Sequence, residues 1–420
     1  MRTQSIALLW DSSHIWGLMA WRALRALGLP CQLVKGKEIA KGNLLRNTTT
    51  RLLLVPGGNA RLKSMALDEA GMSQIRIFVA NGGQYLGFCG GAGLALTQNK
   101  SLHLCPWSRN PYTDRLQHLA SGHLKAKLAC HDLVPKKLQN TQISLPVWWP
   151  GRFAQDASQN VEVLAKAIAS DHDFWLGDLP LASIPEHFFT ILRNEYGVDL
   201  SSAYLADIPL VVTGRYGQGR YVLSYSHLET PESSTANSWL ASLLETFLDQ
   251  SISQTNIPPW DLDQQDFQWP KNTNTSPLYT ALAQTRDLLN LGTDHHLFFR
   301  RTPWLWGWRT GLPGAPLNFL HTAIWTLLSL PPNKKALQYW EGVHDQFQKN
   351  FVLFCNVAEE NLLTNRVAYA LKNVLPKQET TWEHVLRSKA IFGCPRNEGG
   401  LLGPILTILE EIIYLAQEAE

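Results

Sequence analysis

The sequence predicts an α/β domain with a doubly wound, mostly parallel sheet over residues 1–250 and an all-α domain over residues 277–420. The first 100 residues alternate short apolar runs with helical patterns, which is typical of parallel βαβ units. The last domain carries 3.6-residue periodicity, and no strand-rich segment competes with it. Residues 251–276 are rich in Gln, Asn, Thr, Ser and Pro without periodicity, which predicts a linker or a connection along the surface.

Four short apolar runs in the first hundred residues predict the parallel strands. Apolar side chains recur at helical spacing from Trp16 to Leu27 and end before Gly28, which predicts an amphipathic helix packed on the sheet. A second helix is predicted around Ser73–Ala80. The predicted strands are Ile6–Trp10, Cys31–Val34, Leu52–Val55 and Gln84–Phe88.

The middle of the chain contains one clear hairpin. Residues 209–226 show strand, turn and strand, with the turn at Tyr216-Gly217-Gln218-Gly219. Residues 100–150 are interpreted as irregular and Val161–Ala169 as helix-like, and a helix from about Ser234 to Leu248 closes the region. The helices predicted for the last domain are Leu278–Leu291, Leu317–Leu330, Ala336 to about Val374 with a break, and Ile405–Ala416.

Composition excludes several classes of protein. Of the 420 residues, 45% are hydrophobic and 17% charged, which indicates a globular chain. The formal net charge of +2 provides no basic field for nucleic acid or an anionic membrane, so neither is expected as a partner. The chain has 16 Trp, eight of them from Trp260 onward, so we expect aromatic surface around Trp304–Trp308 to dock on the first domain or to bind its ligand.

Six cysteines are scattered without a C-x-x-C pair, which argues against a disulfide framework and a zinc ribbon. Reduced thiols fit a cytoplasmic protein. The N-terminal apolar run ends before Asp11 and is too short for a signal peptide, and Glu410 and Glu411 interrupt the C-terminal apolar stretch, so we expect a soluble chain. The cysteines are Cys31, Cys89, Cys105, Cys130, Cys355 and Cys394.

The segment Tyr85–Leu96 predicts a nucleophile elbow, because it passes from an apolar strand through G-F-C-G-G into a helix. Small residues at Gly87 and Gly91 permit a strained turn. This turn places Cys89 at a helix N-terminus, where backbone amides favour a thiolate and can stabilise an oxyanion. On its own, such a short motif also fits a Gly-rich turn around an inert buried thiol.

His227-Leu228-Glu229 supplies a base and an orienting carboxylate after a predicted strand, since alternate residues of an extended segment point the same way. In this hypothesis His227 takes the thiol proton and returns it to the leaving group, while Glu229 holds the imidazole. The loop Pro56-Gly57-Gly58 offers unhindered amides for an oxyanion hole. All three segments follow predicted strands, at the sheet edge where open α/β folds place their sites. Their joint occurrence favours a catalytic constellation.

Together these motifs resemble the class I glutamine amidotransferase-like superfamily, and specifically the domain found N-terminal in eukaryotic-type biotin-protein ligases. The resemblance rests on strand-G-F-C-G-G-A-helix, the upstream V-P-G-G loop and the downstream Y-G-Q-G-R-Y-V-L-S-Y-S-H-L-E-T-P, and it covers roughly residues 4–248. It implies a flavodoxin-like fold and a triad of Cys89, His227 and Glu229. It also implies that Gly58 and the amide of Gly90 occupy the oxyanion positions.

The chain departs from the family pattern in two places. Glutaminases commonly have Gln four residues after the nucleophile, where it helps bind substrate glutamine, but this position is Gly93 here. The sequence also contains no G-R-G-R-x-G adenylate loop, and Gln268–Asn272 only superficially matches a lysine-W-P-N-D segment. We therefore do not expect biotin ligation.

Other polar clusters are interpreted as structural. Asp171-His172-Asp173 and Asp294-His295-His296 are typical of solvated turns, so no metal is expected. Arg300-Arg301 ahead of Trp304–Trp308 indicates either a cation-π or interface surface, or aromatic residues that fill the gap between the domains. Residues that lack a zinc-finger spacing are Cys105 and Cys130 with the nearby His103, His123 and His131.

The leading hypothesis is a cysteine-dependent hydrolase or amidotransferase that acts on a small amide or acyl substrate and uses no cofactor. The alternative is a non-catalytic metabolite-binding or scaffolding protein that uses the same pocket, with the helical domain as a partner-binding or self-association module. A modification enzyme linked to biotin metabolism rests on fold-level analogy alone.

Overall fold

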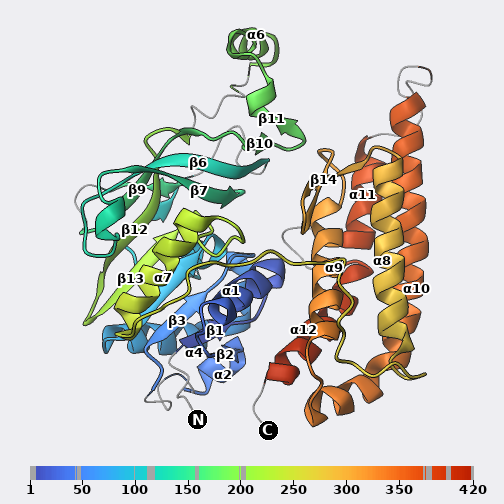
Figure 1. Ribbon diagram of the computed structural model, residues 1–420, viewed down its shortest axis with the longest axis horizontal. Helices are drawn as coiled ribbons and strands as arrows, with labels where there is room; N and C mark the ends of the chain where they lie inside the picture. Colours follow the sequence, from blue (N-terminus) through green and yellow to red (C-terminus); the bar gives the residue numbers. More distant parts are fainter. Residues whose placement is uncertain are drawn as a thin grey trace. The chain divides into compact units, whose positions relative to one another are not determined.

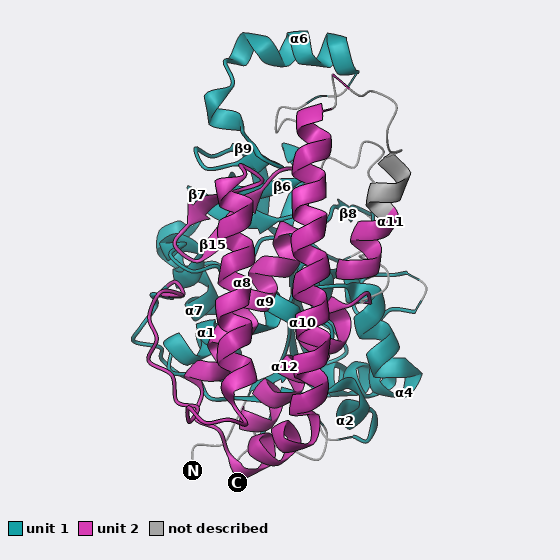
Figure 2. Ribbon diagram, turned by 90° about the vertical axis from the view of Figure 1, so that its right-hand side faces the viewer, with its two compact units in different colours: residues 1–258 teal, residues 259–420 magenta. Residues whose placement is uncertain are grey.

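The computed structural model describes residues 6–417 apart from 43, 45–48, 99, 111–118, 157–159, 198, 200–204, 372–373, 375–380 and 394–398, and for residues 381–385 it describes the backbone alone. Cys394 lies outside the described residues. The chain divides into two compact units, residues 1–258 and 259–420 (Figure 2). Within the described part, no helix combines the length and the apolar character needed to cross a membrane.

Five parallel strands form the part of the sheet that carries the candidate site (Figure 1). Their order is β2-β1-β3-β4-β13, which is the flavodoxin-like strand order with β13 in fifth place. The predicted α/β fold is therefore confirmed, and the first four strands lie where the apolar runs predicted them. The strands are β1 (Ile6–Leu9), β2 (Cys31–Val34), β3 (Leu52–Val55), β4 (Gln84–Phe88) and β13 (Gly219–Ser224).

Helices cover this half of the sheet. Apolar residues of α2, α4 and α5 share one buried cluster with alternate strand residues such as Leu53 and Val55. The buried residues of α1 and α7 lie outside that cluster, and Figure 1 shows both helices in front of the sheet. The helix expected at Ser73–Ala80 begins earlier and bends at Asp68, where φ is 52°. The helices are α1 (His14–Ala26), α2 (Gly36–Ala40), α4 (Ala60–Ala80), α5 (Gly90–Leu94) and α7 (Ser234–Leu248).

Beyond β13 the sheet continues with antiparallel strands. The predicted hairpin is confirmed as β12 (Pro209–Tyr216) and β13. The expectation of a helix at 161–169 is wrong, because this segment is β9 (Glu162–Ser170), and the supposedly irregular stretch 100–150 holds β6 (Ala120–Leu128) and β7 (Gln142–Trp148). The alanine-rich segment of β9 suits a helix locally, but it pairs with β12 on one side and β6 on the other, and these ladders determine its conformation.

Shorter elements complete the first unit. Two-residue strands extend the sheet beyond β6 or form a small ladder of their own. An unexpected helix, α6 (Glu186–Tyr196), has no buried residue and stands away from the sheet in Figure 1. The short strands are β5 (Ser108–Arg109), β8 (Phe153–Ala154), β10 (Trp175–Leu176) and β11 (Leu179–Pro180).

The second unit is helical, as expected, with one hairpin that the sequence analysis missed. This hairpin, β14 (Phe298–Thr302) and β15 (Leu305–Trp308), contains tryptophans at every second position, which is strand periodicity. The expected break in α10 is absent up to Leu371, and α11 was not expected. Trp260 and Trp269 are buried, so part of the segment expected as a linker is anchored. The helices are α8 (Ser276–Asp294), α9 (Gly314–Ser329), α10 (Lys334–Leu371), α11 (Thr381–Phe392) and α12 (Leu402–Gln417).

Candidate active site

Cys89 occupies a sharp turn between β4 and α5. Its φ of 45° lies in a region that non-glycine residues seldom adopt, and its amide donates a hydrogen bond to the Ser224 carbonyl oxygen at 2.7 Å. The turn needs its glycines, because a Cβ on Gly91 would lie 2.0 Å from the carbonyl oxygen of Val55 and one on Gly87 would lie 2.7 Å from the Gly91 backbone. This strand, strained turn and helix have the geometry of a nucleophile elbow.

The Pro-Gly-Gly loop after β3 packs directly on this elbow. A Cβ on Gly90 would lie 2.0 Å from the carbonyl oxygen of Gly58, so the two backbones touch. Gly58 has φ 106°, and a Cβ there would lie 2.2 Å from the carbonyl oxygen of Ser12. A Cβ on Gly57 would lie 2.8 Å from Cε1 of His227. The structure thus gathers the three predicted glycines around Cys89, and their role in oxyanion binding stays a prediction.

His227 and Glu229 follow the end of β13 as a buried hydrogen-bonded pair. Nδ1 of His227 lies 2.7 Å from Oε1 of Glu229, and neither side chain is exposed. The His227 amide donates to the carbonyl oxygen of Pro146 at 2.9 Å, which holds this segment against β7. Nε2 of His227 is buried and has no hydrogen-bond partner of standard geometry in the described part of the chain. It is therefore the ring nitrogen left for the Cys89 sulfur.

The electrostatics of this pair favour a charged imidazole. Burial alone lowers the pKa of His227, but the Glu229 carboxylate and the Cys89 side chain outweigh burial and raise this pKa to about 10. Cys89 thus lies close enough to the ring to affect its pKa, although Nε2 has no hydrogen bond of standard geometry in the described part of the chain. A charged imidazole at this position has the chemistry to serve as counter-ion for a thiolate and as proton donor to a leaving group.

Aromatic rings surround His227, and sequence analysis did not assign them to the site. The Trp16 ring lies 4.5 Å from the His227 ring between centroids, with 35° between the planes, and Phe88 lies 6.5 Å from His227. Trp149 stands edge-on to Trp16 at 5.8 Å. The adjacent tryptophans at 148–149, directly at the end of β7, were the available signal. Such a wall can exclude water and contact an apolar or planar part of a ligand.

A buried lysine supports the loop between β1 and α1. Lys63 of α4 is fully buried, and its Nζ donates to the Asp11 carbonyl oxygen at 2.9 Å and to Oγ of Ser13. Burial raises the pKa of the Asp11 carboxyl, although the Gly36 amide and Lys63 oppose this shift. Because the carbonyl of Ser12 in this loop packs on Gly58, Lys63 helps to position the Pro-Gly-Gly loop after β3. No local motif marks Lys63.

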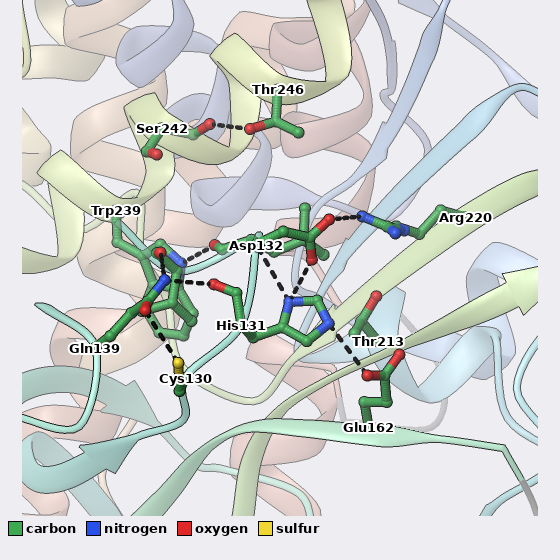
Figure 3. A network of polar contacts seen from close by, with 12 residues as sticks. Cys130, His131, Asp132, Gln139, Glu162, Thr213, Arg220, Trp239, Ser242 and Thr246 are labelled. Carbon is green, nitrogen blue, oxygen red and sulfur yellow. Dashed lines mark hydrogen bonds and ion pairs between the residues drawn. The ribbon is translucent and has the colours of Figure 1, made fainter. Parts of the chain in front are cut away.

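The polar groups around Cys130 form a separate network (Figure 3). Nδ1 of His131 lies 2.7 Å from Asp132 and Nε2 lies 3.3 Å from Glu162, while Arg220 donates to Asp132 at 3.0 Å. Through these contacts the segment after β6 is tied to β9 and β13. Elsewhere, burial raises the pKa of the Cys105 thiol.

The remaining polar candidates have local partners. Asp171 accepts hydrogen bonds from Ser144 at 2.8 Å and from the His172 amide at 2.8 Å, and these bonds lower its pKa although burial opposes them. His295 and His296 end α8 in a turn. In the second unit, Trp304 packs on Trp260 at 5.2 Å and Arg300 stacks on Trp306 at 4.0 Å. Docking of this aromatic surface on the first domain stays a prediction.

The strand order and the elbow define an α/β protein of the flavodoxin-like class with a candidate site at its nucleophile elbow. Residues 33–99 match the family model described as biotin-protein ligase, N terminal, and this segment contains both the Pro-Gly-Gly loop and Cys89. The resemblance is thereby confirmed over these residues.

No curated protein matches the chain. Among solved structures, a glutamine amidotransferase aligns at 18% identity and TM-score 0.37, covering 59% of this chain and 100% of that one. PurLQS from Thermotoga maritima aligns at 13% identity and TM-score 0.39, covering 57% of this chain and 97% of that one.

Proposed function

We propose that the first unit is a cysteine-dependent hydrolase or amidotransferase that acts on a small amide or acyl substrate. The observation that carries this proposal is the position of Cys89, which lies in a strained turn at φ 45° and interacts with the buried His227–Glu229 pair. A structural thiol needs neither the strained turn nor the oriented imidazole.

The chemistry follows from the positions of these groups. The Cys89 thiolate attacks the substrate carbonyl carbon, and the amides of Gly58 and Gly90 receive the resulting oxyanion. His227 donates its proton to the leaving nitrogen or oxygen as the bond to carbon breaks, which leaves a thioester on Cys89. A water molecule, deprotonated by His227, or an amine then takes the acyl group and restores the thiol.

The surroundings of the site support a substrate other than glutamine. Gly93 stands where glutaminases commonly have Gln, and a Cβ there would meet nothing closer than Cβ of Ala60 at 3.7 Å. Trp16 and Trp149 provide aromatic surface beside His227. We therefore infer a substrate whose acyl or leaving group is apolar or planar.

The test compares Cys89 with the exposed thiol of Cys130. We expect the wild-type protein to hydrolyse members of a panel of aryl amides, Cys130→Ala to retain this amide hydrolysis and Cys89→Ala to lose it. Iodoacetamide should modify Cys89 faster than Cys130 at neutral pH, as read by peptide mass spectrometry. Turnover that survives Cys89→Ala would refute the proposal. Metabolite binding without turnover, together with a Cys89 no more reactive than Cys130, would favour the non-catalytic alternative.

A further inference from the structure

A second relay of hydrogen-bonded side chains lies in the first unit and shares no residue with the candidate site around Cys89. Nε2 of His123 lies 2.7 Å from Oγ of Ser233, and Nδ1 of the same ring lies 2.7 Å from Oδ2 of Asp173. His123 belongs to β6, Asp173 to the turn after β9, and Ser233 directly precedes α7. Serine, imidazole and carboxylate are thus connected in the order of a hydrolytic triad.

Asp173 determines the tautomer of His123. Its carboxylate accepts the His123 backbone amide at 3.0 Å through Oδ1 and faces Nδ1 through Oδ2. A carboxylate only accepts, so Nδ1 carries the hydrogen, and in the neutral ring Nε2 then presents a lone pair. The Ser233 hydroxyl then donates to Nε2, which is the arrangement in which an imidazole acts as general base for a serine.

Two features of the backbone, at Gly122 and at the start of α7, accompany this arrangement. Gly122 has φ 112°, and a Cβ there would lie 2.3 Å from the Asp173 carbonyl oxygen, so only glycine lets the turn approach β6 this closely. Ser233 holds the N-cap position of α7, yet its side chain makes no capping hydrogen bond and contacts His123 instead. Ser233 therefore directs its hydroxyl to the His123 ring and not to the first turn of α7.

We propose that Ser233, His123 and Asp173 form a second nucleophilic centre, which hydrolyses small esters. Oγ of Ser233 bonds to the ester carbonyl carbon while its proton passes to Nε2 of His123. The carbon–oxygen bond of the ester breaks as the leaving alkoxide takes that proton, and water then hydrolyses the acyl-serine. Ser233 is 7% exposed, whereas the side chains of His123 and Asp173 are 23% and 37% exposed, so the centre meets solvent beside the imidazole.

The experiment uses the full chain with Cys89→Ala, so that its result does not depend on the first site. A fluorophosphonate probe should add one phosphonyl group with loss of fluoride, and peptide mass spectrometry should locate it on Ser233. The neighbouring exposed Ser234 provides the control: Ser234→Ala should label normally and Ser233→Ala should not. Asp173→Asn should slow labelling at least about a hundredfold, because it disrupts the tautomer that Nε2 requires.

The proposal fails if the folded Cys89→Ala protein, checked by circular dichroism, carries no adduct on Ser233. It also fails if Asp173→Asn labels at the unchanged rate, since Ser233 would then react without the relay. Should Ser233→Ala not fold, Ser233→Cys in the same background replaces it, and its thiol should react with iodoacetamide faster in the presence of His123 than with His123→Gln. Equal rates in that pair would likewise overturn the proposal.

Discussion

Nδ1 of His227 lies 2.7 Å from Oε1 of Glu229, and because both side chains are fully buried, water does not screen this contact. Glu229→Gln keeps the shape and removes the charge that raises the pKa of His227. We expect the pKa of His227 to fall and iodoacetamide modification of Cys89 to slow roughly 10- to 100-fold at neutral pH, a milder effect than the complete loss in Cys89→Ala. NMR titration of His227 provides the direct measurement, and an unchanged pKa would contradict the assigned role of Glu229.

The contact between Gly90 and Gly58 leads to a prediction about two neighbouring glycines. Gly90→Ala would place a methyl group 2.0 Å from the Gly58 carbonyl oxygen, so it must displace the Pro-Gly-Gly loop. We expect a loss of about 1–3 kcal/mol in unfolding free energy and loss of acyl turnover. In Gly93→Ala, three residues away, the added methyl group meets only Cβ of Ala60 at 3.7 Å, an ordinary van der Waals contact, so this variant is the matched control. If both variants behave alike in urea unfolding and turnover, then the close packing of the loop on the elbow contributes neither to stability nor to activity.

Local signals predicted the parallel half of the sheet well. A run such as Leu52–Val55 is apolar throughout and is bounded by a Pro-Gly-Gly turn, so composition and turn chemistry agree. In the antiparallel half of the sheet, composition and turn chemistry do not point to the same element. In β9 the residues Leu164, Ala165 and Ala167 suit a helix as well as a strand, and pairing with β12 and β6, which lie far away in the sequence, decides between them.

The residues of the two candidate sites also differ in whether a local sequence pattern marks them. Cys89 and His227 stand in short motifs with a recognisable order of strand and turn, so the sequence indicated them. Lys63 and Asp11 are 52 residues apart, and no local pattern connects a lysine in a helix with a strand end. His123 and Ser233 are 110 residues apart, and a lone serine before a helix is ordinarily interpreted as a cap. Only the folded chain shows that these groups meet.

Lys63 supports a prediction about the stability of the first unit. Lys63→Met retains most of the volume but leaves the Asp11 carbonyl and Oγ of Ser13 without this donor, and it removes the charge that lowers the pKa of Asp11. We expect a loss of about 3 kcal/mol in unfolding free energy, measured by urea unfolding near neutral pH. The exposed Lys37→Met provides the control and should change stability by less than about 0.5 kcal/mol. Equal effects of the two substitutions on the unfolding free energy would show that the buried hydrogen bonds of Lys63 do not stabilise the first unit.

His321 of α9 gives the second unit a specific acid sensitivity. Burial, together with the nearby charges of Arg286 and Arg300, lowers the pKa of His321 to about 3. In the unfolded chain this histidine titrates near its ordinary value of about 6.5, so between about pH 6.5 and 3 the unfolded state binds the proton and the folded state does not. Stability must therefore fall as the pH decreases through this window, by about 2 kcal/mol at pH 5 relative to pH 8.

His321→Leu should abolish this contribution because it removes the titrating group, whatever its effect on stability at pH 8. Urea unfolding of both proteins at pH 8 and pH 5 isolates the contribution as the difference between their two pH-dependent changes, and other titrating groups cancel. The exposed His187→Leu provides the control and should lose as much stability between pH 8 and pH 5 as the wild-type protein. An equal loss of stability on acidification in the wild-type and His321→Leu proteins would mean that the buried imidazole already accepts the proton in the folded state.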